Sequence, residues 1–142
     1  MFLEKDFNIY KRVENVSAFI MLVEFMESRN CTAEELQLIE FLAQKGNYFL
    51  ENNWKSKIMA YPLTDELIGS IGLIDTNIDI YESKENHLIA DCQFLDTDGV
   101  PVVVYLLVDS EGKLDELDIW KCDYSTINRI PPMSNMTDVN TL

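Results

Sequence analysis

The stretch LIADCQFLDTDGVPVVVYLLVDSEGKLDELDIWKCDY, residues 88–124, decides the fold. Residues 88–95 alternate apolar and polar side chains, which predicts a strand with one buried and one wet face. Residues 100–108 are apolar at almost every position, as in a central strand covered on both faces. Residues 114–124 supply a third strand. The intervening turns are the Asp-rich segments 96–99 and 109–112, so two hairpins in series predict an antiparallel meander.

Helical periodicity precedes the meander. Residues 32–45 form the strongest helix candidate, because Thr32 and Glu35 make a capping box and Gly46 follows the last turn. Residues 15–29 are apolar at helical spacing and predict a buried helix, with a strand over 18–25 as the alternative. Strands are also predicted over 57–61 and 70–74, and 78–81 is a weaker strand candidate.

Together these segments predict an α+β fold: two N-terminal helices packed on an antiparallel β-meander of about five strands. The length of 142 residues fits one domain. We expect that domain over residues 1–127, followed by a loosely ordered C-terminal tail over residues 128–142, because the tail shows no periodicity and contains Pro131-Pro132.

Negative charge is concentrated in one segment. Residues 65–123 hold fifteen acidic side chains against three lysines, which leaves −12 of the total net charge of −14. Charge segregated in this way speeds the capture of positively charged partners and makes that capture sensitive to salt. The eleven Lys and Arg residues are scattered, which argues against nucleic acid and anionic membranes as partners.

The chain begins without the features of a secretory leader, and its longest apolar run is too short to span a bilayer. The three cysteines have no CxxC spacing and are expected as reduced thiols. We therefore expect a cytoplasmic protein.

The residues that could carry chemistry fail the tests of spacing. His87 is the only histidine and has no nucleophile beside it in the sequence. Asp96 and Asp98 resemble the start of a calcium loop, but Leu107 stands where the bidentate glutamate is required. The segment 69–72 is too short for a phosphate-binding motif. We predict no catalytic residue, no cofactor and no metal, and hence not an enzyme.

The third strand of the meander mixes charge with an aromatic side chain. Alternation divides the strand between two faces. One face carries Glu116, Asp118, Trp120, Cys122 and Tyr124, and the other carries Asp115, Leu117, Ile119 and Lys121. Neither face is wholly apolar. This conflict fits either an interaction surface or an edge strand protected by charge.

The pattern from Asp96 to Val102, followed by Gly112 to Tyr124, resembles the end of a family of small bacterial proteins known only as a domain of unknown function. The resemblance extends over residues 30–127, from the Thr32 to Glu35 helix start through Gly69-Ser70, and the Leu-Asp-Ile-Trp-Lys-x-Asp stretch is its most specific part. It implies a bacterial protein with this α+β layout. In size, acidity and lack of catalytic motifs the chain is also similar to immunity proteins of polymorphic and contact-dependent growth-inhibition toxins.

The sequence thus favours an acidic immunity or antitoxin protein that occludes the active site of a basic, co-encoded toxin domain. We expect this toxin domain to be a nuclease. The expected contact residues are Asp115, Glu116, Asp118, Trp120 and Asp123, with Asp96, Asp98, Asp109 and Glu111 as outer steering charges. Two alternatives stay open. One is a small hydrolase or ligand-binding domain with a carboxylate-lined pocket, and the other is a structural module whose acidic residues serve solubility alone.

Overall fold

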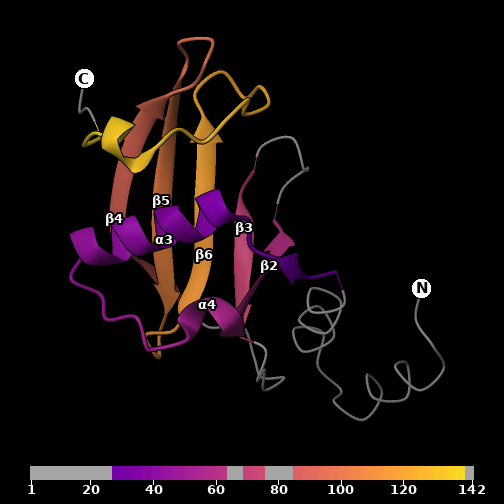
Figure 1. The fold of residues 1–142 in the computed structure, drawn as a ribbon, viewed down its shortest axis with the longest axis vertical. Coiled ribbons are helices and arrows are strands. Elements are labelled where there is room, and N and C mark those ends of the chain that lie inside the picture. The colour runs from indigo at the N-terminus through magenta and orange to yellow at the C-terminus, as the bar shows by residue number, and fades with distance from the viewer. Residues whose placement is uncertain (1–26, 64–68, 76–84, 140–142) are drawn as a thin grey trace, which may run out of the picture.

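The computed structural model describes residues 27–63, 69–75 and 85–139 of the chain. Within these residues the fold is one antiparallel sheet of six strands in the order β1-β2-β3-β6-β5-β4, with helices on one side (Figure 1). The strands are β1 (Arg29–Asn30), β2 (Ile58–Pro62), β3 (Ile71–Asp75), β4 (Asn86–Leu95), β5 (Pro101–Asp109) and β6 (Leu114–Lys121). The helices are α3 (Ala33–Lys45), the short α4 (Trp54–Lys57) and the 3-10 turn η1 (Met133–Asn135).

Helix α3 begins and ends where the sequence predicts. The Thr32 hydroxyl accepts a hydrogen bond from the Glu35 N–H, and the Glu35 carboxylate accepts one from the Thr32 N–H, which completes the capping box. Arg29 of β1 also donates to both carboxylate oxygens of Glu35, at 2.8 and 2.9 Å. The inner stripe of the helix, Leu38, Ile39, Leu42 and Ala43, is buried. The capping box thus fixes how α3 enters the fold, next to the short strand β1.

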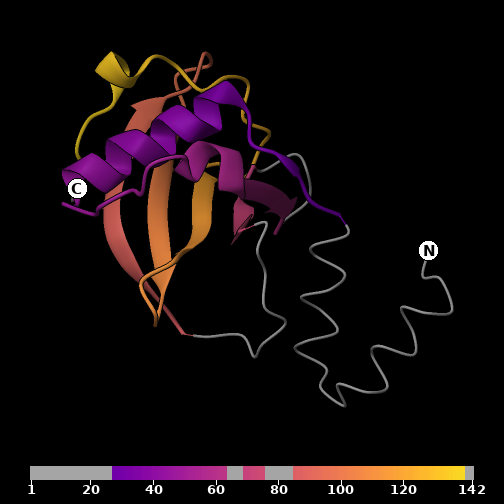
Figure 2. The same cartoon turned by 60° about the horizontal axis from the view of Figure 1, so that its bottom comes forward.

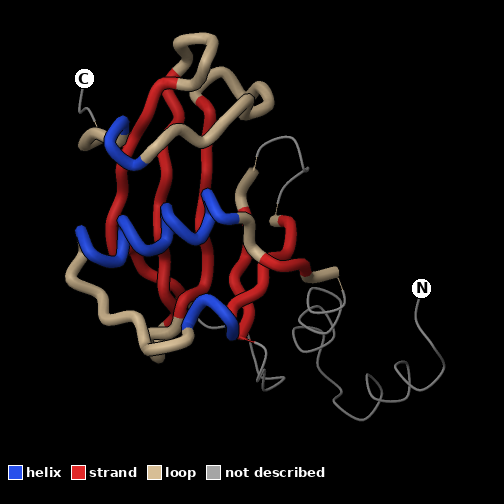
Figure 3. Tube along the Cα trace, in the orientation of Figure 1, coloured by secondary structure: helices blue, strands red, loops and turns tan. Residues whose placement is uncertain are grey.

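The predicted fold class is wrong in two respects. In place of two N-terminal helices, the described residues contain one helix of more than one turn, α3, and residues 29–30 pair with β2 as strand β1. The sheet has six strands, and it is not a simple meander because β3 pairs with β6 (Figure 3). Non-local pairing of this kind leaves no local sequence signal. The helix predicted over 15–29 and the strand predicted over 78–81 fall mainly or wholly outside the described residues.

The predicted hairpins β4–β5 and β5–β6 are confirmed, and their registers fix which side chains share a face. Val104 pairs with Cys92 on one side and with Ile119 on the other, and all three are buried beneath α3. Helix α3, α4 and the segment after β6 all lie on this side of the sheet, and no other described element covers the opposite face (Figure 2). We call that opposite face the outer face. Because side chains alternate along a strand, it carries Glu116, Asp118 and Trp120 of β6.

Strand β6 is an inner strand, which excludes the edge-strand alternative. It pairs with β5 along its length and with β3 through Ile71–Leu117 and Gly72–Glu116. A Cβ atom at Gly72 would lie 2.0 Å from the Tyr61 ring, so this glycine gives the ring room across the sheet. The acidic residues of β6 are therefore not explained by protection of a sheet edge.

The segment after β6 runs back over the sheet and reaches the outer edge of β4. Gln93 and Thr137 exchange two backbone hydrogen bonds of 2.9 Å, and Lys45 of α3 donates to the Asp91 carbonyl at 2.5 Å. Lys45 also forms a salt bridge with Asp138. These contacts occupy part of the edge of β4 that another chain could otherwise pair with. The domain boundary after residue 127 stays a prediction.

No helix in the described residues is long and apolar enough to cross a membrane.

Candidate partner-binding site

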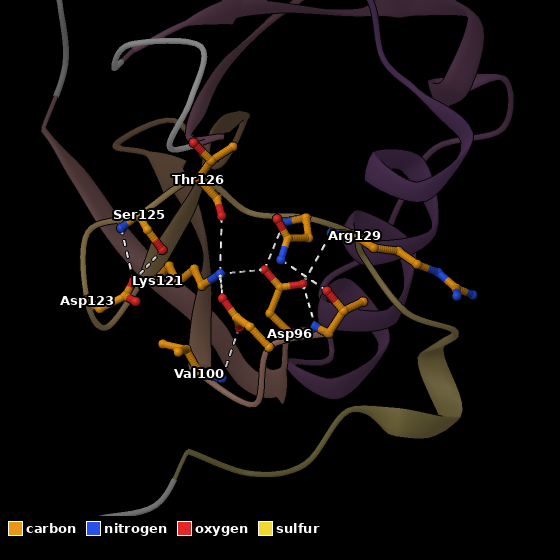
Figure 4. Close-up of polar contacts among 10 residues, drawn as sticks. Asp96, Val100, Lys121, Asp123, Ser125, Thr126 and Arg129 are labelled. Atoms are coloured by element: carbon orange, nitrogen blue, oxygen red, sulfur yellow. Dashed lines mark hydrogen bonds and ion pairs between the residues drawn. The ribbon is translucent and has the colours of Figure 1, made fainter.

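The two ends of β6 hold acidic residues in different surroundings. At the C-terminal end, Lys121 continues the buried register of Leu117 and Ile119, and its side chain is 0% exposed. Its ammonium group donates to Asp96 at 3.0 Å, to Asp98 at 2.6 Å and to the Thr126 carbonyl at 3.1 Å (Figure 4). A buried ammonium group requires such partners, because an unpaired charge in the interior is very costly.

Asp96 connects this cation to the segment after β6. Its carboxylate accepts hydrogen bonds from the backbone N–H groups of Thr97 (2.7 Å), Asn128 (2.8 Å) and Arg129 (3.2 Å). Burial alone raises the pKa of Asp96, but the Asn128 N–H and Lys121 outweigh it and hold the pKa below its ordinary value. Asp96 is thus a buried anion that ties the β4–β5 turn to residues 128–129.

The other residues at this end are also accounted for by contacts within the chain. The hydrogen bond from Lys121 lowers the pKa of Asp98, and bonding to Asp98 in turn raises the pKa of Lys121. Asp123 accepts from the N–H and the hydroxyl of Ser125, which lowers its pKa. Asp123, an expected contact residue, therefore has a partner within the chain, and so do Asp96 and Asp98, which were expected as steering charges.

The β5–β6 turn explains two further acids. One oxygen of Asp109 accepts from the N–H groups of Glu111 (2.8 Å) and Lys113 (3.0 Å), which is the usual role of aspartate at the first position of a turn. Glu111 lies 3.7 Å from the Lys113 ammonium group in an exposed ion pair. Surface pairs of this kind contribute little to stability.

A β-bulge brings the remaining acids together. Leu107 pairs with Glu116 but Val108 pairs with Leu114, so Asp115 is an extra residue in β6. The Asn86 side-chain amide donates to Asp115 at 3.0 Å and also to Glu116. Two adjacent carboxylates that alternation would place on opposite faces therefore share one amide.

Asp118 completes this group on the outer face. Burial raises the pKa of Glu116 to about 7, and the charges of Asp118 and Asp115 add to the shift. The proximity of Asp118 and Glu116 also contributes to the shift of the Glu116 pKa, because two like charges disfavour each other. Burial likewise raises the pKa of Asp115 and of Asp118. No Lys or Arg in the described residues forms an ion pair with this group, which we call the carboxylate cluster: Asp115, Glu116 and Asp118.

An aromatic pair lies beyond the carboxylate cluster on the same strand. Trp120 is two residues after Asp118 and 41% exposed, and its ring centroid is 5.7 Å from that of Tyr124 with the planes tilted by 53°. Tyr124 is 70% exposed. Its φ of 62° is a left-handed backbone conformation, in which the chain turns away from the direction of β6. Two neighbouring exposed aromatic side chains do not help solubility, so they favour a contact surface.

The other sequence candidates add no chemistry here. His87 is exposed near the start of β4, and in the described part of the chain no three His, Cys, Asp or Glu side chains are placed to hold a metal ion. Cys31, Cys92 and Cys122 are free thiols. A groove of about 570 Å³ lies between the first turn of α3 and residues 129–132, and no member of the carboxylate cluster lines it.

Sequence reasoning grouped nine residues, and the structure brings four of them together on the outer face, namely Asp115, Glu116, Asp118 and Trp120. The sequence pattern did not predict Lys121 as the partner of Asp96 and Asp98, and it did not predict Asn86 as the donor to the carboxylate cluster. The signal for Lys121 was present, because a lysine in the same register as Leu117 and Ile119 indicates a buried cation.

Comparison with known proteins gives a family and no function. No curated protein and no solved structure matches the chain. A family described as a domain of unknown function, DUF6984, matches residues 28–131. This span runs from β1 through the Asp96–Lys121 network, and it confirms the resemblance to an uncharacterised family. The chain belongs to the DUF6984 family of domains of unknown function.

Proposed function

We propose that this protein is a binding domain that captures a positively charged protein on the outer face of its sheet, around β6. One observation carries the proposal: the carboxylate cluster has no cation of its own among the described residues, and it adjoins the exposed Trp120. The other acids that the sequence singled out, by contrast, have partners within the chain: Asp96, Asp98, Asp109, Glu111 and Asp123. A localised anionic surface with an aromatic anchor is typical of sites that bind basic proteins.

The physical account separates two contributions. The net charge of −14 attracts a basic partner at long range and can raise the association rate at low salt by about tenfold to a thousandfold. Affinity then depends on a few desolvated side chains near the centre of the contact. Trp120 is the strongest candidate for such an anchor, because it is large, half-exposed and held by Tyr124.

The most specific form of the proposal is an immunity protein for a nuclease toxin. A nuclease groove binds phosphates with Lys and Arg, and carboxylates on a rigid strand can take the place of those phosphates. The carboxylate cluster supplies three such groups on one strand, Asp115, Glu116 and Asp118, and so supports occlusion of the active site. Its partner would then be the basic C-terminal domain of a co-encoded toxin.

The test is co-expression with the toxin domain encoded beside this chain, followed by binding measurements on purified proteins. We expect Trp120→Ala to weaken binding more than tenfold and Asp98→Ala to change it less, because Asp98 is bound to Lys121. Binding should also weaken steeply between 50 and 500 mM NaCl. Equal effects of the two substitutions, or binding insensitive to salt, would exclude the outer face of β6 as the contact surface.

A second candidate, a ligand-binding or hydrolytic site, has one supporting observation. The pKa of Glu116 near 7 suits a general acid or base at neutral pH. If the Glu116–Asp118 pair were catalytic, Glu116→Gln would abolish turnover of a hydrolysable substrate while the same variant still folded.

A further inference from the structure

We infer that the partner presents an arginine side chain to β6, with its guanidinium group bonded to Asp118 and stacked on the ring of Trp120. The inference rests on the proposed function, since it names the chemistry of the partner at that same surface. It goes further because it names which cation the carboxylates receive. The aromatic pair beside the carboxylates adds to the preference for arginine.

Strand geometry places the two contacts at a suitable separation. Asp118 and Trp120 are two residues apart on the outer face of β6, which separates their Cα atoms by about 6.5–7 Å. A guanidinium group bonded edge-on to a carboxylate at that distance can lay its plane against the neighbouring indole ring. Both side chains start from an inner strand of the sheet, so their spacing is fixed by the backbone.

Among the described residues, the neighbours of Asp118 and Trp120 come from β5 and from the residues just after β6. Register places Val103 beside Trp120 and Tyr105 beside Asp118 on the adjacent strand. Val103 is only 7% exposed, so its side chain lies beneath the surface and offers little area for contact with a partner. Tyr124 contacts Trp120 from beyond the end of β6 and limits how far the indole ring can turn.

Arginine fits this arrangement better than lysine for two physical reasons. Its guanidinium group is planar, so it stacks on an aromatic ring while its edge donates two parallel hydrogen bonds to a carboxylate. It is more weakly hydrated than an ammonium group, which lowers the cost of burying it against Trp120. Cation–π contacts at such sites correspond to about a threefold to tenfold gain in affinity.

The test compares two probe peptides, acetyl-GRGRG-amide and acetyl-GKGKG-amide, titrated into the full-length protein at pH 8 and low salt. Two tryptophans allow an internal control, because the indole N–H signals of Trp120 and Trp54 report on different parts of the fold. We expect the arginine peptide to shift the Trp120 signal and to bind about threefold to tenfold more tightly than the lysine peptide, with no shift of Trp54.

Two variants separate the contributions. Trp120→Leu should reduce the preference for arginine while both peptides still bind, because the carboxylate cluster remains. Asp118→Asn should weaken both peptides. Equal affinity of the two peptides for the wild-type protein would overturn the arginine inference and leave the proposed function standing. Failure of both peptides to bind at the carboxylate cluster would contradict the inference and the proposed function together.

Discussion

Acidic side chains lie near both ends of β6, and the two groups have opposite surroundings. At the C-terminal end, Asp96 and Asp98 bind the buried Lys121, and their pKa values lie below the ordinary range. On the outer face, the carboxylate cluster has no cation, and the pKa of Glu116 rises to about 7. Burial acts on Asp96 and Glu116 in the same direction, so the difference comes from the cation and the backbone donors around Asp96.

This contrast shows that the number of acidic residues is a poor guide to a binding surface. Acids that stabilise the fold are already bound to donors within the chain, and a partner could recruit them only by breaking those bonds. Acids that repel one another instead gain when a cation arrives. The carboxylate cluster is of the second kind, which is why we propose that a partner binds there and not at the Asp-rich turns.

The largest expected effect is at Asp96. Asp96→Asn leaves Lys121 buried with one weaker partner, and we expect it to lower the free energy of unfolding by about 3–5 kcal/mol. Urea denaturation at pH 7 measures this loss. Asp123→Asn is the matched control, because Asp123 lies on an exposed turn and bonds only to Ser125. A loss at Asp96 no greater than that at Asp123 would show that the network is not structural.

The second effect has the opposite sign and depends on pH. Because the pKa of Glu116 is raised from 4.5 to about 7 on folding, the folded protein binds more protons than the unfolded chain between these values. The stability from protonated Glu116 is complete below pH 4.5 and is lost as pH rises through about 7. Glu116→Gln keeps the neutral form, so at pH 8 it should exceed the wild type by about 1 kcal/mol after discounting for solvent screening.

Urea denaturation at pH 4 and pH 8 checks this prediction. The advantage of Glu116→Gln should disappear at pH 4, where wild-type Glu116 is itself protonated. Glu40→Gln is the control, since Glu40 is an exposed residue of α3 that forms only a surface pair with Lys55. A stability difference that is the same at both pH values would mean that Glu116 titrates normally.

The smallest expected effect is that of salt. Raising NaCl from 0.01 to 0.5 M shortens the screening length from about 30 Å to about 4 Å and should stabilise the wild type by a few tenths of a kcal/mol. The gain should shrink in the double variant Glu116→Gln/Asp118→Asn, which removes repulsion within the carboxylate cluster. An equal gain in both proteins would place the repulsion elsewhere in the molecule.

Local patterns predicted the local elements and missed what depends on distant contacts. The capping box at Thr32 and the alternation in residues 88–95 gave α3 and β4 correctly. The pairing of β3 with β6 joins Gly72 to Glu116, which are more than forty residues apart in the sequence. The residues next to either one therefore do not predict the pairing. For this reason the sequence left open whether β6 was an edge strand.

The candidate site was predicted in part for the same reason. Alternation correctly placed Glu116, Asp118 and Trp120 on one face, because that pattern is local. It assigned Asp115 to the other face, since a bulge is visible only once the register with β5 is known. The distinction between Asp96 and Glu116 needed the position of Lys121, which the fold supplies.

The most direct test of this account is an NMR titration of the side-chain carboxyl groups of Asp96 and Glu116 in the intact protein. The account predicts that Glu116 titrates near pH 7 and that Asp96 stays charged below the ordinary range of aspartate. Addition of the arginine peptide should then lower the midpoint of Glu116 and leave Asp96 unchanged. Similar, ordinary midpoints for both groups would contradict the division of the acidic residues on which the proposed function depends.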